Sequence, residues 1–326
     1  MDVLIVEPLD PDVLHWLAAR HAVHYAPELA QQPHAFRESL QRVRSVIIPP
    51  GVALDAAALQ RAPVLRIVGR LSAGAENIDL EACARAGIEV VRPASASAGA
   101  EAEFVIGALL QMLRRVPIVG EDGMLAGREL GGLTVGLIGM TTTVKPLQCL
   151  LQAFGARIVG YDPGVHASDP VWARSAVEPV GLRELLQGSD AVAVLMTYYP
   201  RYAGLFGERL LAECRLNQVW VSLAHSNLFD ETALAQALRE GPLAAAWLDS
   251  LEPGALDPGR PLRHIDTLQV TPRVGATTQQ SRVRSAWAVA RRIDELLLSA
   301  PPPPRPDFSR TQPGAFADLE DGPAPV

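Results

Sequence analysis

The sequence predicts an α/β protein made of two doubly wound parallel sheets, each in a domain of its own. Short apolar segments of strand length alternate with amphipathic segments of helix length along the chain. Such alternation favours a parallel sheet that is covered by helices on both faces. The length of 326 residues allows two domains with separate cores. A hydrophobic content of 48% and a charged content of 20% are typical of a globular protein.

The first domain is expected to span residues 1–98. Its predicted strands are Val3–Val6, Ser45–Ile48, Leu65–Val68 and Ile88–Val91. The helices between them are predicted around Pro11–Arg20, Ala56–Arg61 and Leu80–Ala86. A long last helix, within residues 279–300, is expected to return to this domain and complete it.

The second domain is expected to span residues 99–278 and to open with a long helix at about Ala100–Leu113. Its predicted strands are Thr134–Ile138, Arg157–Tyr161, Ala191–Leu195, Val219–Leu223, Ala244–Leu248 and Thr267–Val270. Its helices are predicted near Val144–Phe154, Leu182–Leu186, Glu208–Cys214 and Glu231–Glu240. Two such domains in series predict a cleft between them. Residues 301–326 are a proline-rich tail, for which no regular structure is expected.

Charge and cysteine content exclude several classes of function. The formal net charge of −7 argues against nucleic acid as the main partner. No apolar run approaches the roughly 20 residues of a membrane span, so no membrane is expected as a partner. The first residues also lack the basic start and the cleavage site of a signal peptide. Three scattered cysteines, Cys83, Cys149 and Cys214, indicate thiols in a reducing cytoplasm rather than a disulfide framework or a metal site.

The segment GLIGMTTTVKPLQCLLQAFGARIVGYDP, residues 136–163, has the outline of a dinucleotide-binding unit. A strand ends at a tight turn, a helix follows, and a second strand closes on Asp162. The usual turn reads G-x-G-x-x-G, and the matching positions here are Gly139, Thr141 and Val144. Gly139 keeps the glycine of the tight turn. Thr141 places a branched side chain where the phosphates approach, and Val144 fills the packing notch between helix and strand.

Two interpretations of this altered turn remain open. The amides of a helix N-terminus attract anions without the glycines, and the hydroxyls of Thr141, Thr142 and Thr143 can donate to phosphate oxygens. Alternatively, the segment is a threonine-rich helix start that binds nothing. Asp162 stands where an acidic residue accepts from the ribose hydroxyls, which favours NAD over NADP because a carboxylate repels a 2′-phosphate. Its alternative role is that of a turn former before Pro163.

Further segments identify a family resemblance that runs from about Leu65 to Leu298. They are GRLSAGAENIDLEACARAGIEVV, VSLAHSNLFDETALAQAL, AAAWLDSLEP and VTPRVGATT, in addition to the dinucleotide unit. Together they resemble the D-isomer-specific 2-hydroxyacid dehydrogenases, a group that includes phosphoglycerate dehydrogenases. The resemblance implies a flavodoxin-like substrate domain, a Rossmann domain that binds NAD, and a homodimer built through the Rossmann domain. It also implies an oxidoreductase that acts on a small anionic 2-hydroxy or 2-keto acid.

The resemblance implies three catalytic residues, and two of them, the arginine and the histidine, have exchanged places. The family uses an arginine, a glutamate and a histidine, and the corresponding positions here are His225, Glu252 and Arg273. Arginine does not give up its proton in a protein, so Arg273 is expected to hold the substrate anion. Histidine exchanges protons near neutral pH, so His225 is expected to be the acid and base, with Glu252 orienting one of the two. The alternative is a decayed site in which these side chains are unrelated.

The remaining site residues also follow from the resemblance. The cofactor is expected to contact Gly139, Thr141, Thr142, Thr143, Asp162, Met196, Ala224, Asp249 and Gly275. The substrate is expected to contact Ser72, Ala73, Gly74, Arg273 and Tyr199. Tyr199 belongs to the segment LMTYYPRYAG, which replaces the P-L-T-type loop of the family and either closes a pocket or packs on its neighbours. Two other functions stay open: a protein that senses NAD(H) or a metabolite without turnover, and another reaction at the same site.

Overall fold

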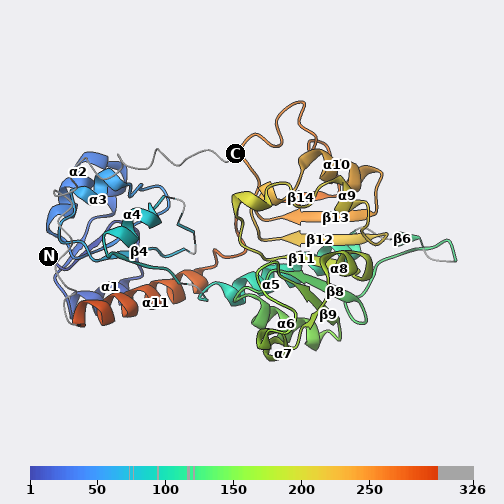
Figure 1. Cartoon of the computed structure of the whole chain (residues 1–326), viewed down its shortest axis with the longest axis horizontal. Helices are drawn as coiled ribbons and strands as arrows, with labels where there is room; N and C mark the ends of the chain where they lie inside the picture. The colour runs from blue at the N-terminus through green and yellow to red at the C-terminus, as the bar shows by residue number, and fades with distance from the viewer. Residues whose placement is uncertain (73, 76, 94, 116–117, 120–121, 300–326) are drawn as a thin grey trace, which may run out of the picture. The chain divides into compact units, whose positions relative to one another are not determined.

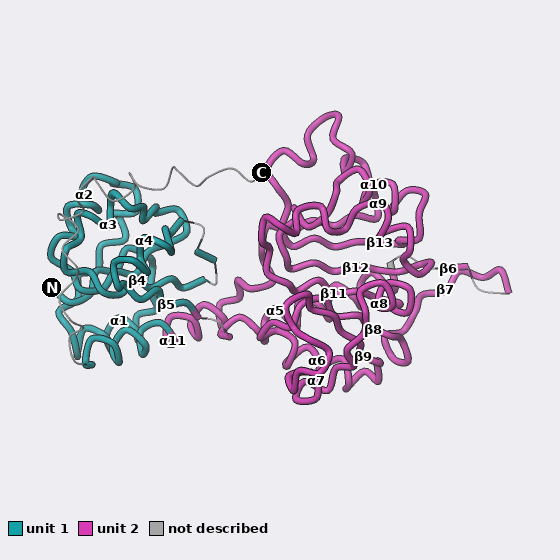
Figure 2. The backbone as a smooth tube through the Cα atoms, viewed as in Figure 1, with its two compact units in different colours: residues 1–92, 289–326 teal, residues 93–288 magenta. Residues whose placement is uncertain are grey.

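The computed structural model describes residues 1–299 apart from 73, 76, 94, 116–117 and 120–121. The chain forms two compact units, which Figure 2 shows in different colours. Unit 1 holds Met1–Arg92 and the chain from Val289 onward, and unit 2 holds Pro93–Ala288. The sequence placed these boundaries at 98/99 and 278/279, whereas the units divide before helix α5 (Ala98–Arg115) and within helix α11 (Gln279–Leu298).

Unit 1 is a parallel five-stranded sheet with the strand order β2-β1-β3-β4-β5. The strands are β1 (Val3–Ile5), β2 (Val23–Tyr25), β3 (Ser45–Ile47), β4 (Ile67–Gly69) and β5 (Glu89–Val91). The helices are α1 (Pro11–Ala18), α2 (Pro33–Ser39), α3 (Ala56–Gln60) and α4 (Leu80–Arg85). The second half of α11 packs on this sheet, because a Cβ atom at Gly69 would lie 2.9 Å from Val289 and 3.1 Å from Ile293.

Unit 2 contains a parallel seven-stranded sheet with the order β10-β9-β8-β11-β12-β13-β14 (Figure 1). The strands are β8 (Thr134–Ile138), β9 (Arg157–Tyr161), β10 (Glu178–Pro179), β11 (Ala191–Val194), β12 (Gln218–Ser222), β13 (Leu243–Leu248) and β14 (Leu268–Val270). The direction of strand succession reverses between β8 and β11. In open α/β sheets this switch point, at the carboxyl ends of the strands, is where ligands bind.

Helices cover both faces of this sheet, as the predicted α/β class requires. One face carries α5, α6 (Val144–Ala153) and α7 (Pro170–Ser175), which share an apolar core that includes Leu109, Leu147 and Trp172. The other face carries α8 (Leu182–Gly188), α9 (Glu208–Leu211) and α10 (Glu231–Arg239), with a core around Trp220. The prediction of two doubly wound parallel sheets is confirmed. Within the described residues, no helix is long and apolar enough to cross a membrane.

Three short strand pairings were not predicted. Strands β2 and β10 lie at sheet edges and are three and two residues long, so they carry too little apolar pattern to be recognised. The segment after α5 forms a two-stranded antiparallel ladder of β6 (Ile118–Val119) and β7 (Leu125–Ala126). Val119, Met124 and Leu125 on this hairpin are each exposed by 65% or more.

Candidate functional site

The predicted cofactor and catalytic residues lie at one edge of the seven-stranded sheet. Gly139 follows β8, Asp162 follows β9, Met196 follows β11, Ala224 and His225 follow β12, Asp249 follows β13 and Gly275 follows β14. Because all seven strands are parallel, their carboxyl ends meet at the same edge. The candidate site of unit 2 is therefore this edge, at the switch point between β8 and β11.

The turn after β8 requires a glycine at its first position. Gly139 has a φ of +106°, in the region that favours glycine. Its N–H donates to the carbonyl oxygen of Tyr161 at 2.8 Å. A Cβ atom here would lie 2.4 Å from the backbone nitrogen of Met196, so the loop after β11 lies directly against the turn. Met196 and Ala224 are themselves buried.

The threonines of the turn differ in their surroundings. Thr143 is 2% exposed, and its hydroxyl donates to Oε2 of Glu101 on α5. Oε1 of Glu101 accepts from the hydroxyl of Ser97 at 2.8 Å. Thr142 is exposed, whereas Oγ1 of Thr141 is buried and has no hydrogen-bond partner among the described residues. Thr143 therefore connects the turn to α5, whereas the hydroxyl of Thr141 has no partner among the described residues.

The carboxylate of Asp162 holds the same turn from the side of β9. Its Oδ2 accepts from the N–H of Met140 and its Oδ1 from the N–H of Gly164, each at 2.7 Å. Carboxylate oxygens have two acceptor positions each, so both keep capacity for a ligand hydroxyl. The phenol of Tyr161 lies beside it. Burial raises the pKa of this phenol most, and the charges of Tyr202 and Asp162 raise it further.

His225 and Glu252 form a close pair. Nε2 of His225 lies 3.1 Å from Oε1 of Glu252, and the two side chains are 26% and 42% exposed. Nδ1 of His225 accepts from the N–H of Asn227 at 3.3 Å, which caps a short helical turn. The ring of Tyr198 stacks on the imidazole with 4.8 Å between centroids and 23° between planes. Tyr198 was not predicted as a partner, because the sequence does not show which loops face one another; Asn227, two residues from His225, was not predicted either.

Asp249 fixes the loop that carries Arg273. Asp249 is 4% exposed; its Oδ1 accepts from Oγ1 of Thr271 at 2.6 Å and its Oδ2 from the N–H of Gly275 at 2.7 Å. The indole N–H of Trp247 donates to Thr271 at 3.0 Å. Arg273 has a φ of +57°, and its N–H donates to the carbonyl oxygen of Asp249 at 2.8 Å. The sequence did not identify Thr271 and Trp247 as supports of this loop.

The Arg273 side chain lies against Ser250, which follows β13. Its Nε lies 3.4 Å from the hydroxyl of Ser250. Tyr199 contacts Tyr202, with 6.3 Å between ring centroids, and the guanidinium of Arg201, at 5.2 Å. The tyrosine that stacks on His225 is Tyr198, which precedes Tyr199 in the chain.

The predicted substrate loop of unit 1 follows β4. The hydroxyl of Ser72 accepts from Nη2 of Arg70 at 2.7 Å, and Nη1 of Arg70 donates to Oδ1 of Asn77. Arg70 is 1% exposed, so this guanidinium is a buried support of the loop that the sequence analysis did not identify. Gly74 lies on the loop between these contacts, and Ala73 lies outside the described residues.

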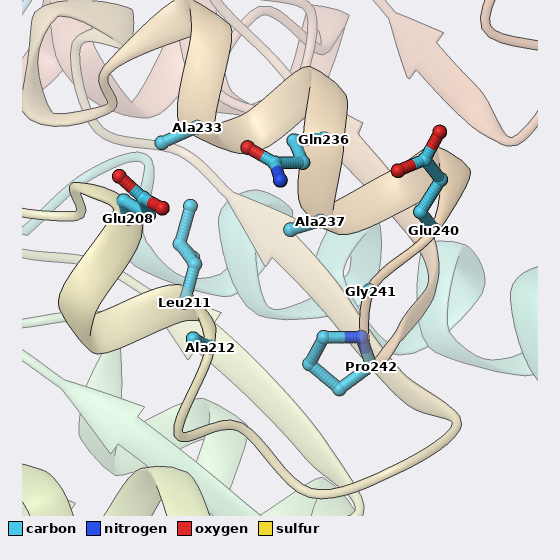
Figure 3. Close-up of a pocket in the computed structure, with 9 residues that line it drawn as sticks. All are labelled: Glu208, Leu211, Ala212, Ala233, Gln236, Ala237, Glu240, Gly241 and Pro242. Atoms are coloured by element: carbon cyan, nitrogen blue, oxygen red, sulfur yellow. The ribbon is translucent and has the colours of Figure 1, made fainter.

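A surface pocket of about 270 Å³ lies elsewhere in unit 2 (Figure 3). Leu211 of α9 and Ala237 of α10 line it, together with Glu240 and Pro242. Pro242 directly precedes β13, so the pocket lies at the amino end of that strand, opposite the candidate site. Within the described part of the chain, no three His, Cys, Asp or Glu side chains are grouped so as to hold a metal ion.

Residues 110–275, which are half of the chain, match the model of the D-isomer specific 2-hydroxyacid dehydrogenase, NAD binding domain. The chain belongs to the D-isomer-specific 2-hydroxyacid dehydrogenase family. All predicted cofactor residues, from Gly139 to Gly275, lie within the matched stretch. NAD is therefore the cofactor of this domain, and the resemblance in the sequence is confirmed.

Known members of the family match nearly the whole chain. The (S)-sulfolactate dehydrogenase of Chromohalobacter salexigens is 29% identical over 305 residues, which cover 91% of this chain and 98% of that protein. The D-3-phosphoglycerate dehydrogenase of Methanocaldococcus jannaschii is 29% identical over 90% of this chain, but the chain spans only 57% of that relative. The crystal structure of the TT0316 protein from Thermus thermophilus has a TM-score of 0.74 and 26% identity, and covers 94% of this chain and 99% of its own.

The turn of this family member fits NAD in three respects. Gly139 forms the tight turn, the Asp162 carboxylate stands at the end of β9, and the buried Thr141 hydroxyl has no partner among the described residues. The missing glycines do not remove these features. Asp162 holds the backbone of the turn at Met140, and the side chain of Thr143 connects the turn to Glu101.

Proposed function

We propose that this chain is an NAD-dependent oxidoreductase that interconverts a small anionic 2-hydroxy acid and its 2-keto acid. The observation that carries the proposal is the His225–Glu252 pair, at 3.1 Å, beside the dinucleotide turn on one sheet edge. Such a reaction needs a proton exchanger within reach of the cofactor and a cation for the carboxylate. The pair supplies the first, and Arg273 supplies the second.

NAD would be held by the turn at Gly139 and Thr141, by Asp162, and by the buried residues after β11 to β14. When bound, it supplies or takes up the hydride on the carbon that carries the oxygen. The chain's own residues exchange the proton on that oxygen and hold the carboxylate. Arg273 is suited to the carboxylate because a guanidinium offers a bidentate, charge-assisted contact. We propose that unit 1 is the substrate domain, with Ser72, Ala73 and Gly74 offering backbone amides.

The relatives support the substrate class. Sulfolactate and phosphoglycerate, which their names contain, are small 2-hydroxy acids with a second anionic group. We propose 2-keto acids of this size as substrates. The test is NADH oxidation with glyoxylate, pyruvate, 3-sulfopyruvate and 3-phosphohydroxypyruvate. At least one of them should be reduced.

Two variants assign the roles within this activity. Removal of the pair in His225→Ala/Glu252→Ala should lower kcat about 10²–10⁴-fold, which is the typical contribution of acid/base catalysis. Arg273→Ala should chiefly raise KM, because a substrate contact is lost. An unchanged kcat in the double variant would remove the pair from the chemistry.

The preference for NAD over NADP is assigned to Asp162. Asp162→Asn keeps an acceptor for one backbone N–H and removes the charge that repels a 2′-phosphate. The ratio of Kd values for NADPH and NADH should therefore fall in this variant. If the ratio stays the same, Asp162 serves only the turn. Binding is measured by fluorescence titration.

A second candidate function is NAD(H) sensing without turnover. The observation that favours it is the engagement of Thr143 by Glu101, together with Val144 in place of the third glycine. A parent protein that binds NADH but reduces none of the keto acids would support this function and overturn the first.

We further propose a cytoplasmic homodimer built through unit 2. Helix α5 leads into the β6–β7 hairpin, on which Val119, Met124 and Leu125 are exposed. Exposed apolar side chains on a projecting element indicate a partner surface. Sedimentation should give a dimer at micromolar concentration, and Leu125→Glu should shift it toward a monomer.

A further inference from the structure

We propose that Glu101 is a positioning residue for the cofactor. It holds the hydroxyl of Thr143 away from the start of helix α6 and so leaves the N–H of Lys145 available to the pyrophosphate of NAD. This assignment deepens the proposed function and rests on its cofactor site, but it does not depend on turnover.

Thr143 stands at the position that caps helix α6. A threonine at such a position commonly accepts a hydrogen bond from one of the first helical N–H groups. In the described chain, the Thr143 side chain makes no such bond, and its φ of −69° and ψ of −24° are helical rather than extended. Helices α7 and α10 begin in the usual way, because the side chains of Asp169 and Asp230 each accept from a backbone N–H of their own helix at 2.8 Å. The side chain that is placed to cap α6 is therefore directed elsewhere.

The missing capping bond would use the N–H of Lys145. A capping side chain accepts from the second or third residue of the helix, and the third residue of α6 is Pro146, which has no N–H. The N–H of Lys145, the second residue, has no hydrogen-bond partner within the described part of the chain. Free N–H groups at the start of a helix bind phosphate, and the partial positive charge there attracts it. The uncapped start of α6 thus keeps a donor for the pyrophosphate.

The Glu101 carboxylate accounts for the direction of the Thr143 hydroxyl. Thr143 is 2% exposed, and its hydroxyl donates to Oε2 of Glu101. Oε1 of Glu101 accepts from the hydroxyl of Ser97 at 2.8 Å, and the N–H of Glu101 donates to the carbonyl oxygen of Ser97 at 2.9 Å. Ser97 therefore holds the carboxylate from the side of α5. A hydrogen bond to a charged acceptor is stronger than one between neutral groups, so the hydroxyl stays with Glu101 rather than with α6.

Loss of Glu101 has two effects on the affinity for NAD, and they have opposite signs. The freed Thr143 hydroxyl is expected to rotate and accept from the N–H of Lys145, as an ordinary cap does, so that NAD must displace it. The negative charge of Glu101 repels an anion, and its removal alone favours binding. Substitutions that separate the hydrogen bond from the charge therefore test the assignment.

The first test is NADH titration followed by fluorescence. Glu101→Ala should raise the Kd about three- to tenfold, which corresponds to competition from a typical capping contact. Glu101→Gln keeps an acceptor for the Thr143 hydroxyl, so its Kd should equal that of the parent or fall below it. Glu103→Ala is the matched control, because Glu103 is exposed on α5 two residues further along, and its Kd should not change. Equal or tighter binding by Glu101→Ala would overturn the assignment.

A double variant distinguishes positioning from a general structural role. Thr143→Val in the Glu101→Ala background removes the competing hydroxyl, so the double variant should bind NADH more tightly than Glu101→Ala alone. If the pair only stabilised the turn, the second substitution would weaken binding further or leave it unchanged, and either result would contradict the proposal.

A third measurement needs no cofactor. Amide hydrogen exchange of the free protein, followed by NMR, should be slower at Lys145 in Glu101→Ala than in the parent, because the hydroxyl then caps this N–H. The same exchange rate in both proteins would count against the proposed rotation of Thr143. A parent that binds no NADH would instead overturn the cofactor site of the proposed function, which distinguishes the two failures.

Discussion

Replacement of Gly139 by alanine tests whether close contact, rather than backbone conformation alone, requires glycine in the dinucleotide turn. Gly139 has a φ of +106°. Its added Cβ would lie 2.4 Å from the nitrogen, 2.5 Å from the Cα and 2.8 Å from the Cβ of Met196. Two of these atoms are backbone, so the loop after β11 must move to admit a methyl group.

The matched control is Gly155, where α6 has just ended. Gly155 has a φ of +80°, and no atom lies within 4 Å of the position its Cβ would take. Alanine there meets only the backbone strain of the left-handed region, about 1–2 kcal/mol. Gly139→Ala adds the overpacking against Met196, about 1–3 kcal/mol. The free energy of unfolding should therefore fall by about 1–2 kcal/mol in the control and about 2–5 kcal/mol in Gly139→Ala.

The assay is urea unfolding of each variant, followed by the fluorescence of the tryptophans. Trp172 and Trp220 of unit 2 are buried, so their emission reports on the unit that holds the turn. NADH titration of the folded variants adds a second measure, because only Gly139→Ala should displace the loop that borders the site. Equal losses of stability in the two variants would refute the argument from close contact.

Three other substitutions and treatments have definite expected outcomes. Val144→Gly restores the third glycine of the family turn and should lower the free energy of unfolding by about 2–4 kcal/mol. The reasons are that Val144 is 1% exposed in the core and that glycine is a poor helix former. Urea unfolding measures the change. Iodoacetamide should label the exposed Cys149 of the native protein but not Cys214, since burial raises the pKa of the Cys214 thiol to about 12; mass spectrometry locates the label. Asp2→Asn should lower stability at pH 7 by at most about 1 kcal/mol and have a smaller effect at low pH. The N–H of Ala22 holds the pKa of Asp2 below its ordinary value, so the stabilisation is present above that ordinary value and is lost as the pH falls through the lowered pKa; thermal unfolding at pH 7 and at low pH checks this.

The sequence predicted the strands that border the site because each is a short apolar run between polar turns. Thr134–Ile138 and Arg157–Tyr161 were predicted with the bounds that β8 and β9 have. Their parallel arrangement then brings Gly139, Asp162, His225 and Asp249 to one edge, as the pattern required. The edge strand at Glu178–Pro179 escaped prediction, since two residues carry no periodicity.

The contacts between loops could not be predicted in the same way. The sequence suggested Thr143 as a phosphate ligand, and nothing local indicated that Glu101, from another helix, accepts its hydroxyl. Likewise, Tyr198 and Tyr199 are neighbours of one type, and only the direction of the loop after β11 decides which ring meets His225. Such pairings depend on tertiary geometry, whereas strands and turns depend on residues close in the chain.

The lost glycines and the exchanged residues have a common consequence for how this edge is held. A glycine-rich turn is compact because it has no side chains. The turn of this chain carries side chains, and carboxylates from neighbouring elements hold it. Glu101 holds Thr143, Asp162 holds Met140 and Gly164, and Asp249 holds the loop of Arg273.

Hydrogen bonds to a charged acceptor contribute about 1.5–3 kcal/mol each, which is sufficient to maintain a residue such as Arg273 in a left-handed conformation. The loop of Arg273 is thereby held by its backbone, and the Nε of its side chain lies 3.4 Å from the hydroxyl of Ser250. The imidazole of His225 accepts a backbone hydrogen bond at Nδ1, lies 3.1 Å from Glu252 at Nε2, and is stacked on one face by Tyr198. Each exchanged residue thus has a hydrogen bond within its own part of the edge: Nδ1 of His225 accepts from the N–H of Asn227, and the N–H of Arg273 donates to the carbonyl oxygen of Asp249.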